Sequence, residues 1–181
     1  SRVTADGVPV ALVTERSTYG SELTSVVGFA RANDPGFVTD ANSFQRAFAG
    51  VDYVFNWFYV DSRDISYFGS GLLPVRAAGH NPDLPRSGDR KYDWQGFEPF
   101  ARHARQTNPP QGYLTSWNNK QAPQFPAADN QWAYGPISRP PRPEDRIKAG
   151  LGRGAQAARV GAAGARAGPA DPPRRGRALL P

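Results

Sequence analysis

The sequence predicts an α+β fold in which antiparallel strands are combined with a few short helices. Residues 53–60, Y-V-F-N-W-F-Y-V, are aromatic or β-branched at almost every position and form the strongest strand signal in the chain. The polar residues 61–64 then turn the chain into a second apolar run at residues 65–68, which predicts a hairpin. Upstream of this hairpin, Phe44 and Phe48 are four residues apart and indicate one apolar face of a helix.

Two N-terminal segments also have strand character. Residues 8–15 are expected to form a strand that leads into a turn at Tyr19 and Gly20. Residues 25–29, S-V-V-G-F, are expected to be the neighbour of that strand.

Because residues 53–60 are apolar almost throughout, we expect both faces of the strand that they form to be buried.

Helix signals occur at two places. Asp40 or Asn42 can cap the first helix, which should end near Gly50. Glu144 opens a segment with acidic residues in its first turn, which favours a second helix. Between these helices, residues 113–117 are expected to form a short strand.

Residues 79–119 combine the composition of a loop with the aromatic content of a folded region. The segment is dense in Gly, Pro, Asn and Asp, yet large aromatic residues occur throughout it. Disordered loops of that polarity seldom carry aromatics, because they have no core in which to bury them. We therefore expect a long, ordered, irregular region packed by its own rings, which is where functional sites tend to lie.

The composition changes after Lys148, which divides the chain into a folded part, residues 1–148, and a tail, residues 149–181. The tail consists mostly of Ala, Gly, Arg and Pro and is expected to be disordered. Out-of-frame translation of GC-rich DNA would give a similar composition, and both explanations stay open. Because almost all of the net charge of +6 arises in this tail, the charge does not indicate a nucleic-acid partner of the folded part.

Other global features exclude several classes of protein. The chain has no Cys, which excludes disulfides and thiolate sites. No apolar run approaches the ~20 residues that a membrane span needs, so no membrane partner is expected. The chain also has no Met and no signal-like N-terminal stretch, so we expect it to be a piece of a longer product, and any export signal would lie upstream of this piece.

Four short motifs in the loop region occur in a specific order. They are G-H-N-P-D-L-P at 79–85, Y-D-W-Q-G at 92–96, N-P-P-Q-G-Y-L at 108–114 and W-N-N at 117–119. In this order and spacing they resemble the penicillin acylase (penicillin amidase) family of N-terminal-nucleophile hydrolases. The resemblance covers about residues 8–147 and corresponds to the middle and later part of the family's catalytic β chain.

The resemblance implies a four-layer αββα sandwich with two antiparallel sheets, of which this chain is a fragment. It also implies hydrolysis of a linear amide, such as a penicillin, an acyl-homoserine lactone or a lipopeptide, through an acyl-enzyme on an N-terminal Ser. The other partners would be the remaining α and β chain segments of the same precursor, in the periplasm or outside the cell. The alternative is a non-enzymatic β-rich binding module with aromatic-lined loops.

Ser1 does not match the nucleophile of the family. In the family the nucleophilic Ser is usually followed by Asn and then an apolar strand, whereas here Arg2, Val3 and Thr4 follow. We therefore expect this chain to lack the nucleophile and to be inactive by itself. His80 and His103, the only histidines, have no recognisable partner for a Ser-His-Asp triad and are expected to be non-catalytic.

Three residues match catalytic or substrate-binding positions of the family. Asn118, the first Asn of W-N-N, would donate a hydrogen bond to the oxyanion of the tetrahedral intermediate, whereas Asn119 is expected to be structural. Arg139 would organise charge near the nucleophile, and Phe55 would line the acyl pocket. Turn formation by Asn118, a surface position for Arg139 and ordinary core packing of Phe55 are the alternatives.

Asp129 and Pro82 match positions that hold a structural calcium in several family members. Asp129 would supply a carboxylate and Pro82 a backbone carbonyl, which are both hard oxygen ligands. The remaining ligands would lie outside this chain, so the calcium site would be incomplete here. A turn residue is the alternative for Asp129. No organic cofactor is expected.

Overall fold

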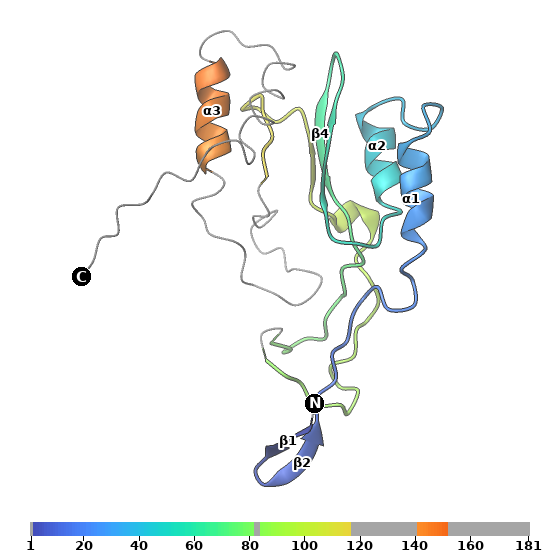
Figure 1. Ribbon diagram of the computed structural model, residues 1–181, viewed down its shortest axis with the longest axis vertical. Helices are drawn as coiled ribbons and strands as arrows, with labels where there is room; N and C mark the ends of the chain where they lie inside the picture. Colours follow the sequence, from blue (N-terminus) through green and yellow to red (C-terminus); the bar gives the residue numbers. More distant parts are fainter. Residues whose placement is uncertain (1, 82–83, 117–140, 152–181) are drawn as a thin grey trace, which may run out of the picture. The chain divides into compact units, whose positions relative to one another are not determined.

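A computed structural model describes residues 2–81, 84–116 and 141–151 (Figure 1). The chain divides into two units, and each is described by itself. The described part of the first unit ends at Leu114 and contains every strand named below; the described part of the second comprises Thr115, Ser116 and one helix.

The described part of the first unit contains two antiparallel sheets, two α-helices and one 3₁₀ helix. A hairpin is formed by β1 (Arg2–Ala5) and β2 (Val8–Ala11). The helices α1 (Ser25–Ala32) and α2 (Ala41–Phe48) follow. A three-stranded sheet of order β3-β4-β5 is formed by β3 (Asn56–Val60), β4 (Ile65–Gly69) and β5 (Arg105–Thr107), with the 3₁₀ helix η1 (Phe100–Arg102) before its last strand.

The N-terminal hairpin has a different partner from the one that the sequence predicted. β2 pairs with β1 and ends at Ala11, whereas the prediction paired residues 8–15 with residues 25–29. Asp6 and Gly7 connect the strands with φ angles of 51° and 77°. A two-residue Asp-Gly loop with two positive φ angles matches the right-handed twist of a hairpin, so the nearest segment becomes the partner.

Residues 25–29 begin helix α1, so the strand prediction for them was wrong. Ser25 and Gly28, three residues apart, form the buried stripe of this helix. A Cβ atom at Gly28 would lie 2.6 Å from Val51 Cγ2, so only Gly allows α1 to approach residues 50–51 this closely. Tertiary packing of these small residues outweighs the strand preference of Val26 and Val27.

Helix α2 confirms the predicted capping and the predicted apolar face. Asp40 is the N-cap residue, and its carboxylate accepts a hydrogen bond from the Ser43 amide at 2.7 Å. The Ser43 hydroxyl in turn accepts from the Asp40 amide, which completes a reciprocal capping arrangement. Phe44 and Phe48 lie on one face, with ring centroids 4.9 Å apart.

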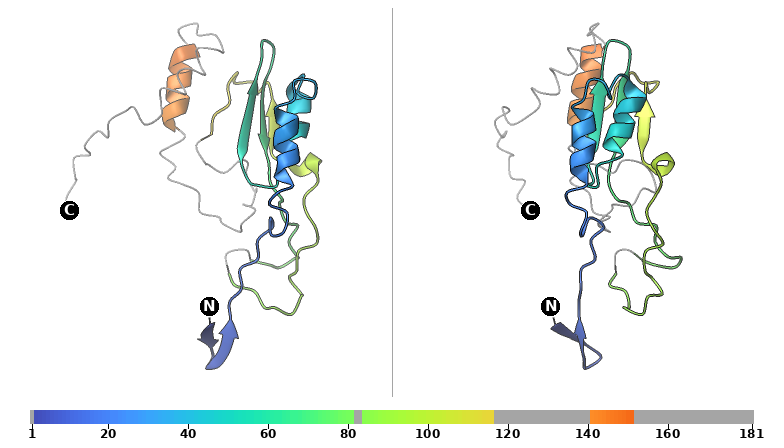
Figure 2. Two further views of the ribbon diagram at one scale, coloured as in Figure 1. Left: turned by 45° about the vertical axis from the view of Figure 1, so that its right-hand side comes forward. Right: turned by 90° about the vertical axis from the view of Figure 1, so that its right-hand side faces the viewer.

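The predicted hairpin is present, with Val60 opposite Ile65 and Trp57 opposite Phe68. Helices α1 and α2 lie against one face of the β3-β4-β5 sheet (Figure 2). The core between these layers is a cluster of buried apolar side chains: Phe44, Phe48, Val51 and Phe68.

The expectation that both faces of residues 53–60 are buried was wrong for the described residues. Phe58 is 46% exposed and Val60 is 63% exposed. The physical reason is that side chains alternate between the faces of an antiparallel strand. Within the first unit, the described helices cover only one of those faces.

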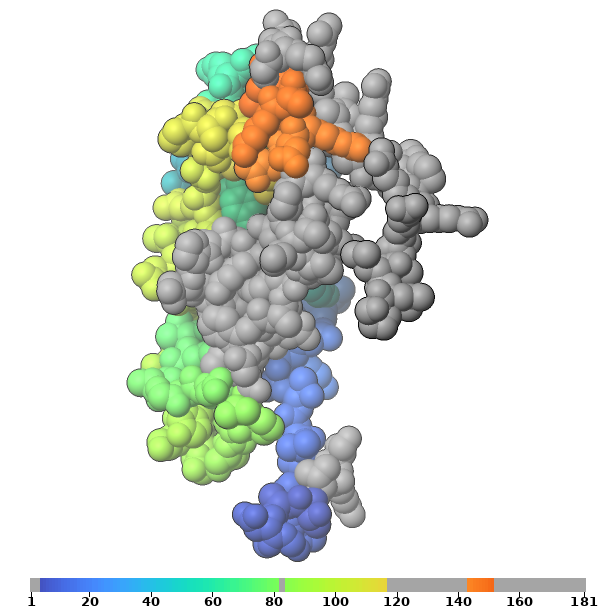
Figure 3. Space-filling model, turned by 90° about the vertical axis from the view of Figure 1, so that its left-hand side faces the viewer, coloured from blue at the N-terminus to red at the C-terminus, as the bar shows by residue number. Residues whose placement is uncertain are grey.

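The described part of the loop region, residues 79–81 and 84–116, is mostly irregular, as predicted, but it also contains η1 and β5, which the sequence did not predict. Its chain pairs back onto residues 73–75, with the Glu98 amide donating to the Leu73 carbonyl at 2.8 Å. The rings of Trp94 and Phe97 lie 6.2 Å apart, and Figure 3 shows the green residues of this loop gathered together. Residues 113–116 are described but form no strand, so that prediction was wrong for them.

The second unit contains α3 (Pro141–Leu151), which confirms the predicted helix. The helix begins three residues before Glu144, since Pro is favoured in the first turn. Lys148 Nζ pairs with Glu144 Oε1 at 2.8 Å, one helical turn away. The helix includes residues 149–151, which the sequence placed in the tail, and residues 152–181 lie outside the described residues.

Candidate functional site

Most residues that the sequence singled out lie outside the described residues. These are Ser1, Pro82, Asn118, Asn119, Asp129 and Arg139. Their roles therefore stay predictions, and no distance between them is given by the described residues. Within residues 2–81, 84–116 and 141–151, no three His, Cys, Asp or Glu side chains gather as a metal site. Phe55 is the candidate site residue whose surroundings can be described.

Phe55 stands immediately before β3, and its side chain is 51% exposed. Its ring lies between two aromatic neighbours, with centroid distances of 5.6 Å to Trp57 and 6.4 Å to Tyr53. Trp57 is stacked on Phe48 at 4.1 Å, which ties this group to the core beneath α2. A half-exposed ring on an aromatic support is an apolar surface that can contact an acyl group.

The backbone that carries Phe55 is paired with residues 70–72, directly after β4. The Gly71 amide donates to the Val51 carbonyl at 3.1 Å, and the Leu72 amide donates to the Asp52 carbonyl at 3.0 Å. These bonds continue the pairing of β3 and β4 beyond the regular strands. They hold the approach to β3 in place although it is not itself part of a strand.

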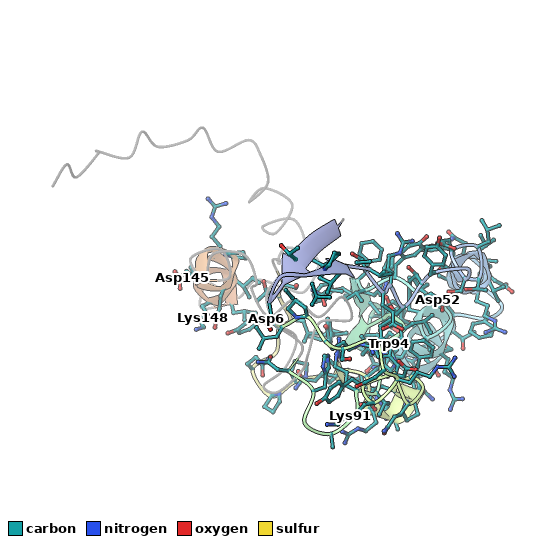
Figure 4. The ribbon with its side chains drawn as sticks, turned by 90° about the horizontal axis from the view of Figure 1, so that it is seen from below. Asp6, Asp52, Lys91, Trp94, Asp145 and Lys148 are labelled. Carbon is teal, nitrogen blue, oxygen red and sulfur yellow. The ribbon has the colours of Figure 1, made fainter. Side chains whose placement is uncertain are left out.

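Asp52 links this approach to the start of α1, and sequence reasoning missed it. Its carboxylate is hydrogen-bonded to the Thr24 hydroxyl, and its amide donates to Ser25 Oγ at 2.9 Å. Partial burial raises the pKa of the Asp52 carboxyl, and a hydrogen bond from Ser21 partly offsets this rise. Figure 4 labels Asp52 on the side of the unit where α1 and α2 lie. The only sequence feature that could have pointed to Asp52 is its position directly before the apolar run at residues 53–60.

Both histidines contact aromatic rings, and His103 also contacts the backbone at the end of β4. His103 Nδ1 lies 2.8 Å from the Gly69 carbonyl, and its ring is stacked on Phe68 with centroids 5.3 Å apart. His80 lies beside Tyr92 in the loop, with ring centroids 5.9 Å apart. These contacts join β4 to the segment before β5 and fix part of the loop.

Comparison with known proteins places these features in a family. The sequence model of the family described as "Penicillin amidase" matches residues 3–166. Penicillin G acylase of Escherichia coli is 41% identical over 75 residues, which is 41% of this chain and 9% of that protein. The acyl-homoserine lactone acylase QuiP of Pseudomonas fluorescens is 28% identical over 116 residues, which is 64% of this chain and 14% of that protein.

A solved structure gives the same result for the fold. The thermostable penicillin G acylase from Alcaligenes faecalis matches with a TM-score of 0.58 and 27% sequence identity. The match covers 75% of this chain and 28% of that chain, and the chain spans 9 to 14% of the length of the curated relatives named above.

The helices in the described residues were also compared with the length and apolarity that a membrane span requires, and none of them meets both requirements.

The motif order in the loop, the α+β architecture and the two kinds of comparison agree. The family match covers most of the chain, including α1, α2 and α3, all three strands of the larger sheet and the loop motifs. The chain therefore belongs to the penicillin amidase family of amidohydrolases.

Proposed function

We propose that this chain is part of an acylase that hydrolyses a linear amide and forms an acyl-enzyme on an N-terminal Ser other than Ser1. The observation that carries the proposal is the family match over residues 3–166, supported by 41% identity to a penicillin G acylase over 75 residues. The relatives are a penicillin G acylase and acyl-homoserine lactone acylases, so amides of these two types are the first substrates to test. Lipopeptides are a further class.

The reaction needs a nucleophile, a base and an oxyanion donor. An N-terminal Ser supplies the hydroxyl, and its own α-amino group, with a pKa of ~7.7–8.0, is a suitable base near neutral pH. The Asn118 amide donates to the oxyanion that forms when the carbonyl carbon is attacked. Arg139 adds positive charge near this centre. Ser1 is not the nucleophile in this scheme, because Arg2 and Val3 do not match the start of the family's β chain.

Phe55 contacts the acyl group in this scheme. Its half-exposed ring is apolar, and the polar groups of its two aromatic neighbours are engaged elsewhere, the Trp57 N–H with Ser70 and the Tyr53 hydroxyl with the Glu22 carbonyl. Such a surface selects acyl groups by shape and size, and a difference of one methylene changes selectivity by ~10–200-fold. Phe55 therefore contributes to acyl specificity and not to bond cleavage.

Asp129 and Pro82 take part in a structural calcium site in this proposal. The Asp129 carboxylate and the Pro82 carbonyl are the oxygen donors that calcium prefers. Other segments of the same precursor supply the remaining ligands. The ion would stabilise the assembled protein, which we place in the periplasm or outside the cell by analogy with the family.

The test is to express the complete reading frame that contains this chain and to assay it beside the 181-residue chain. Phenylacetyl and fatty-acyl anilides report amide hydrolysis directly, and N-terminal sequencing of the processed protein identifies the nucleophile. We expect hydrolysis by the complete protein, none by the chain alone, and a Ser followed by Asn at the processed terminus. Turnover by the chain that Ser1→Ala abolishes would contradict the assignment of Ser1. A complete protein that binds an acyl amide without hydrolysing it would instead favour the binding module.

A further inference from the structure

We infer that Ser70 is a positioning residue that fixes the Phe55 ring and thereby sets acyl-group selectivity. The inference rests on the role of Phe55 in the proposed function. Ser70 directly follows β4 and is only 1% exposed, so a substrate that binds from solution cannot touch its side chain. Its effect must pass through the groups to which it is hydrogen-bonded.

Ser70 is bonded to Phe55 and to both of its aromatic neighbours. Its amide donates to the Phe55 carbonyl at 3.0 Å. Its hydroxyl accepts a hydrogen bond from Trp57 Nε1 at 2.9 Å and donates to the Tyr53 carbonyl at 2.6 Å. One hydroxyl therefore uses its donor and one of its two acceptor sites on the two residues that flank the Phe55 ring.

The geometry makes this hydroxyl difficult to replace. Trp57 is held on its other side by stacking on Phe48, so the direction of its indole N–H is set from two sides. Gly71 has a φ angle of 126°, and a Cβ atom there would lie 2.7 Å from Val54 Cγ2. The chain after β4 thus passes directly against the segment that carries Phe55, and the Ser70 side chain joins the two.

Ser66, which lies in β4 itself, is a matched control. It is also a fully buried serine, with an exposure of 0%, and its hydroxyl is also used in hydrogen bonds. Its partners are Gln45, Gln106 and Thr107. Because those partners are not Phe55 or its aromatic neighbours, Ser66→Ala removes a buried hydroxyl of the same kind without touching the support of Phe55.

The first measurement uses the 181-residue chain. Nuclear Overhauser contacts between the Phe55 ring and the rings of Trp57 and Tyr53 are compared in wild type, Ser70→Ala and Ser66→Ala. We expect the contacts to weaken at least two-fold in Ser70→Ala, and to be retained in Ser66→Ala and in Ser70→Thr, which keeps a hydroxyl. If Ser70→Ala does not fold, Trp57→Phe removes the indole N–H while leaving an aromatic ring, and the contact between the Phe55 and Tyr53 rings, which this variant retains, should weaken in the same way.

The second measurement uses the complete enzyme and the ratio of kcat/KM for a phenylacetyl and a fatty-acyl amide. Misplacing one pocket wall should change this ratio by about 5- to 10-fold in Ser70→Ala, through KM more than kcat. This is less than the ~10–200-fold effect of one methylene in an apolar pocket, because the Phe55 ring is displaced and not removed. Ser66→Ala should leave the ratio within two-fold of wild type. Ser70→Thr should restore it.

The outcomes separate this inference from the proposed function. Unchanged ring contacts in Ser70→Ala, or equal loss of contacts in Ser66→Ala, would overturn the positioning role. Weakened contacts with an unchanged selectivity ratio would overturn the link to specificity. If the complete wild-type enzyme hydrolyses neither amide, the proposed function fails, and the ring contacts alone still decide whether Ser70 positions Phe55.

Discussion

The Nε2 atom of Gln45 lies 2.9 Å from the hydroxyl of Ser66, so a buried side chain of α2 is bonded to a buried side chain of β4. Gln45 also donates to Thr107 Oγ1 at 3.2 Å, and the Ser66 hydroxyl lies 3.0 Å from the same oxygen. These three polar groups, of which Gln45 and Ser66 are buried and Thr107 is exposed, join the helix to two strands. Satisfied polar groups in a core specify one arrangement of the elements around them.

Replacing Gln45 by Ala should therefore destabilise the chain by about 1–3 kcal/mol, because Ser66 and Thr107 lose a buried partner. The free energy of unfolding from urea titration measures this directly. Arg46→Ala is the control, since Arg46 is the next residue of α2 and is exposed. Equal effects of the two substitutions would contradict the importance of the buried network.

Gly28→Ala should destabilise the chain, although Gly→Ala in an exposed helix position normally stabilises by about 0.5–1 kcal/mol. The added Cβ atom would lie 2.6 Å from Val51 Cγ2 and 2.8 Å from the carbonyl carbon of Gly50. Overpacking of this kind costs about 1–3 kcal/mol. The thermal denaturation temperature measures this effect and should fall in Gly28→Ala. An increase would mean that α1 does not pack this closely.

Asp40 should make stability depend on pH in the acid range. Hydrogen bonds from the Ser43 amide and hydroxyl lower the pKa of the Asp40 carboxyl below its ordinary value of 3.8. A lowered folded-state pKa gives stability that is present above the unfolded value and is lost as pH falls through the folded one. Asp40→Asn keeps a capping oxygen without a titrating group. The stability difference between wild type and this variant, measured by urea titration from pH 6 to pH 2, should therefore change only in the acid part of that range.

Asp52 should have the opposite effect. Partial burial raises the pKa of its carboxyl above 3.8, so the charged form is less favourable in the folded state than in the unfolded one. Its contribution is therefore fully present below the unfolded pKa and is lost as pH rises through the folded pKa. Asp52→Asn, which can still bond Thr24, should gain stability relative to wild type between about pH 4 and pH 7. A constant difference across this range would contradict the raised pKa.

In the complete enzyme, Asn118→Ala should lower kcat by ~10²–10³-fold with little change in KM, because the amide acts on charge that exists only in the transition state. Asn119→Ala is the control, since Asn119 is expected to be structural. A large loss of activity from Asn119→Ala alone would show that the wrong Asn was assigned. If both variants keep their turnover but lose stability, the turn interpretation is correct.

Local sequence was sufficient where the signal lies within a few residues. The Asp40 cap, the Phe44 and Phe48 face, the hairpin between β3 and β4 and the start of α3 near Glu144 were all predictable. Each depends on contacts between residues close in the chain. The family resemblance was also readable from sequence, because the four loop motifs have a specific order.

Tertiary structure decided the features that depend on residues far apart in the chain. Residues 25–29 became a helix because Gly28 fits against Val51, a contact that β propensity cannot anticipate. The exposure of Phe58 depends on which face of the sheet the helices cover. The bonds that join Ser70 to Tyr53 and Trp57 exist only because β4 returns beside β3. Sequence therefore determined the local elements and the family, whereas long-range packing and hydrogen bonding determined how Phe55 is supported.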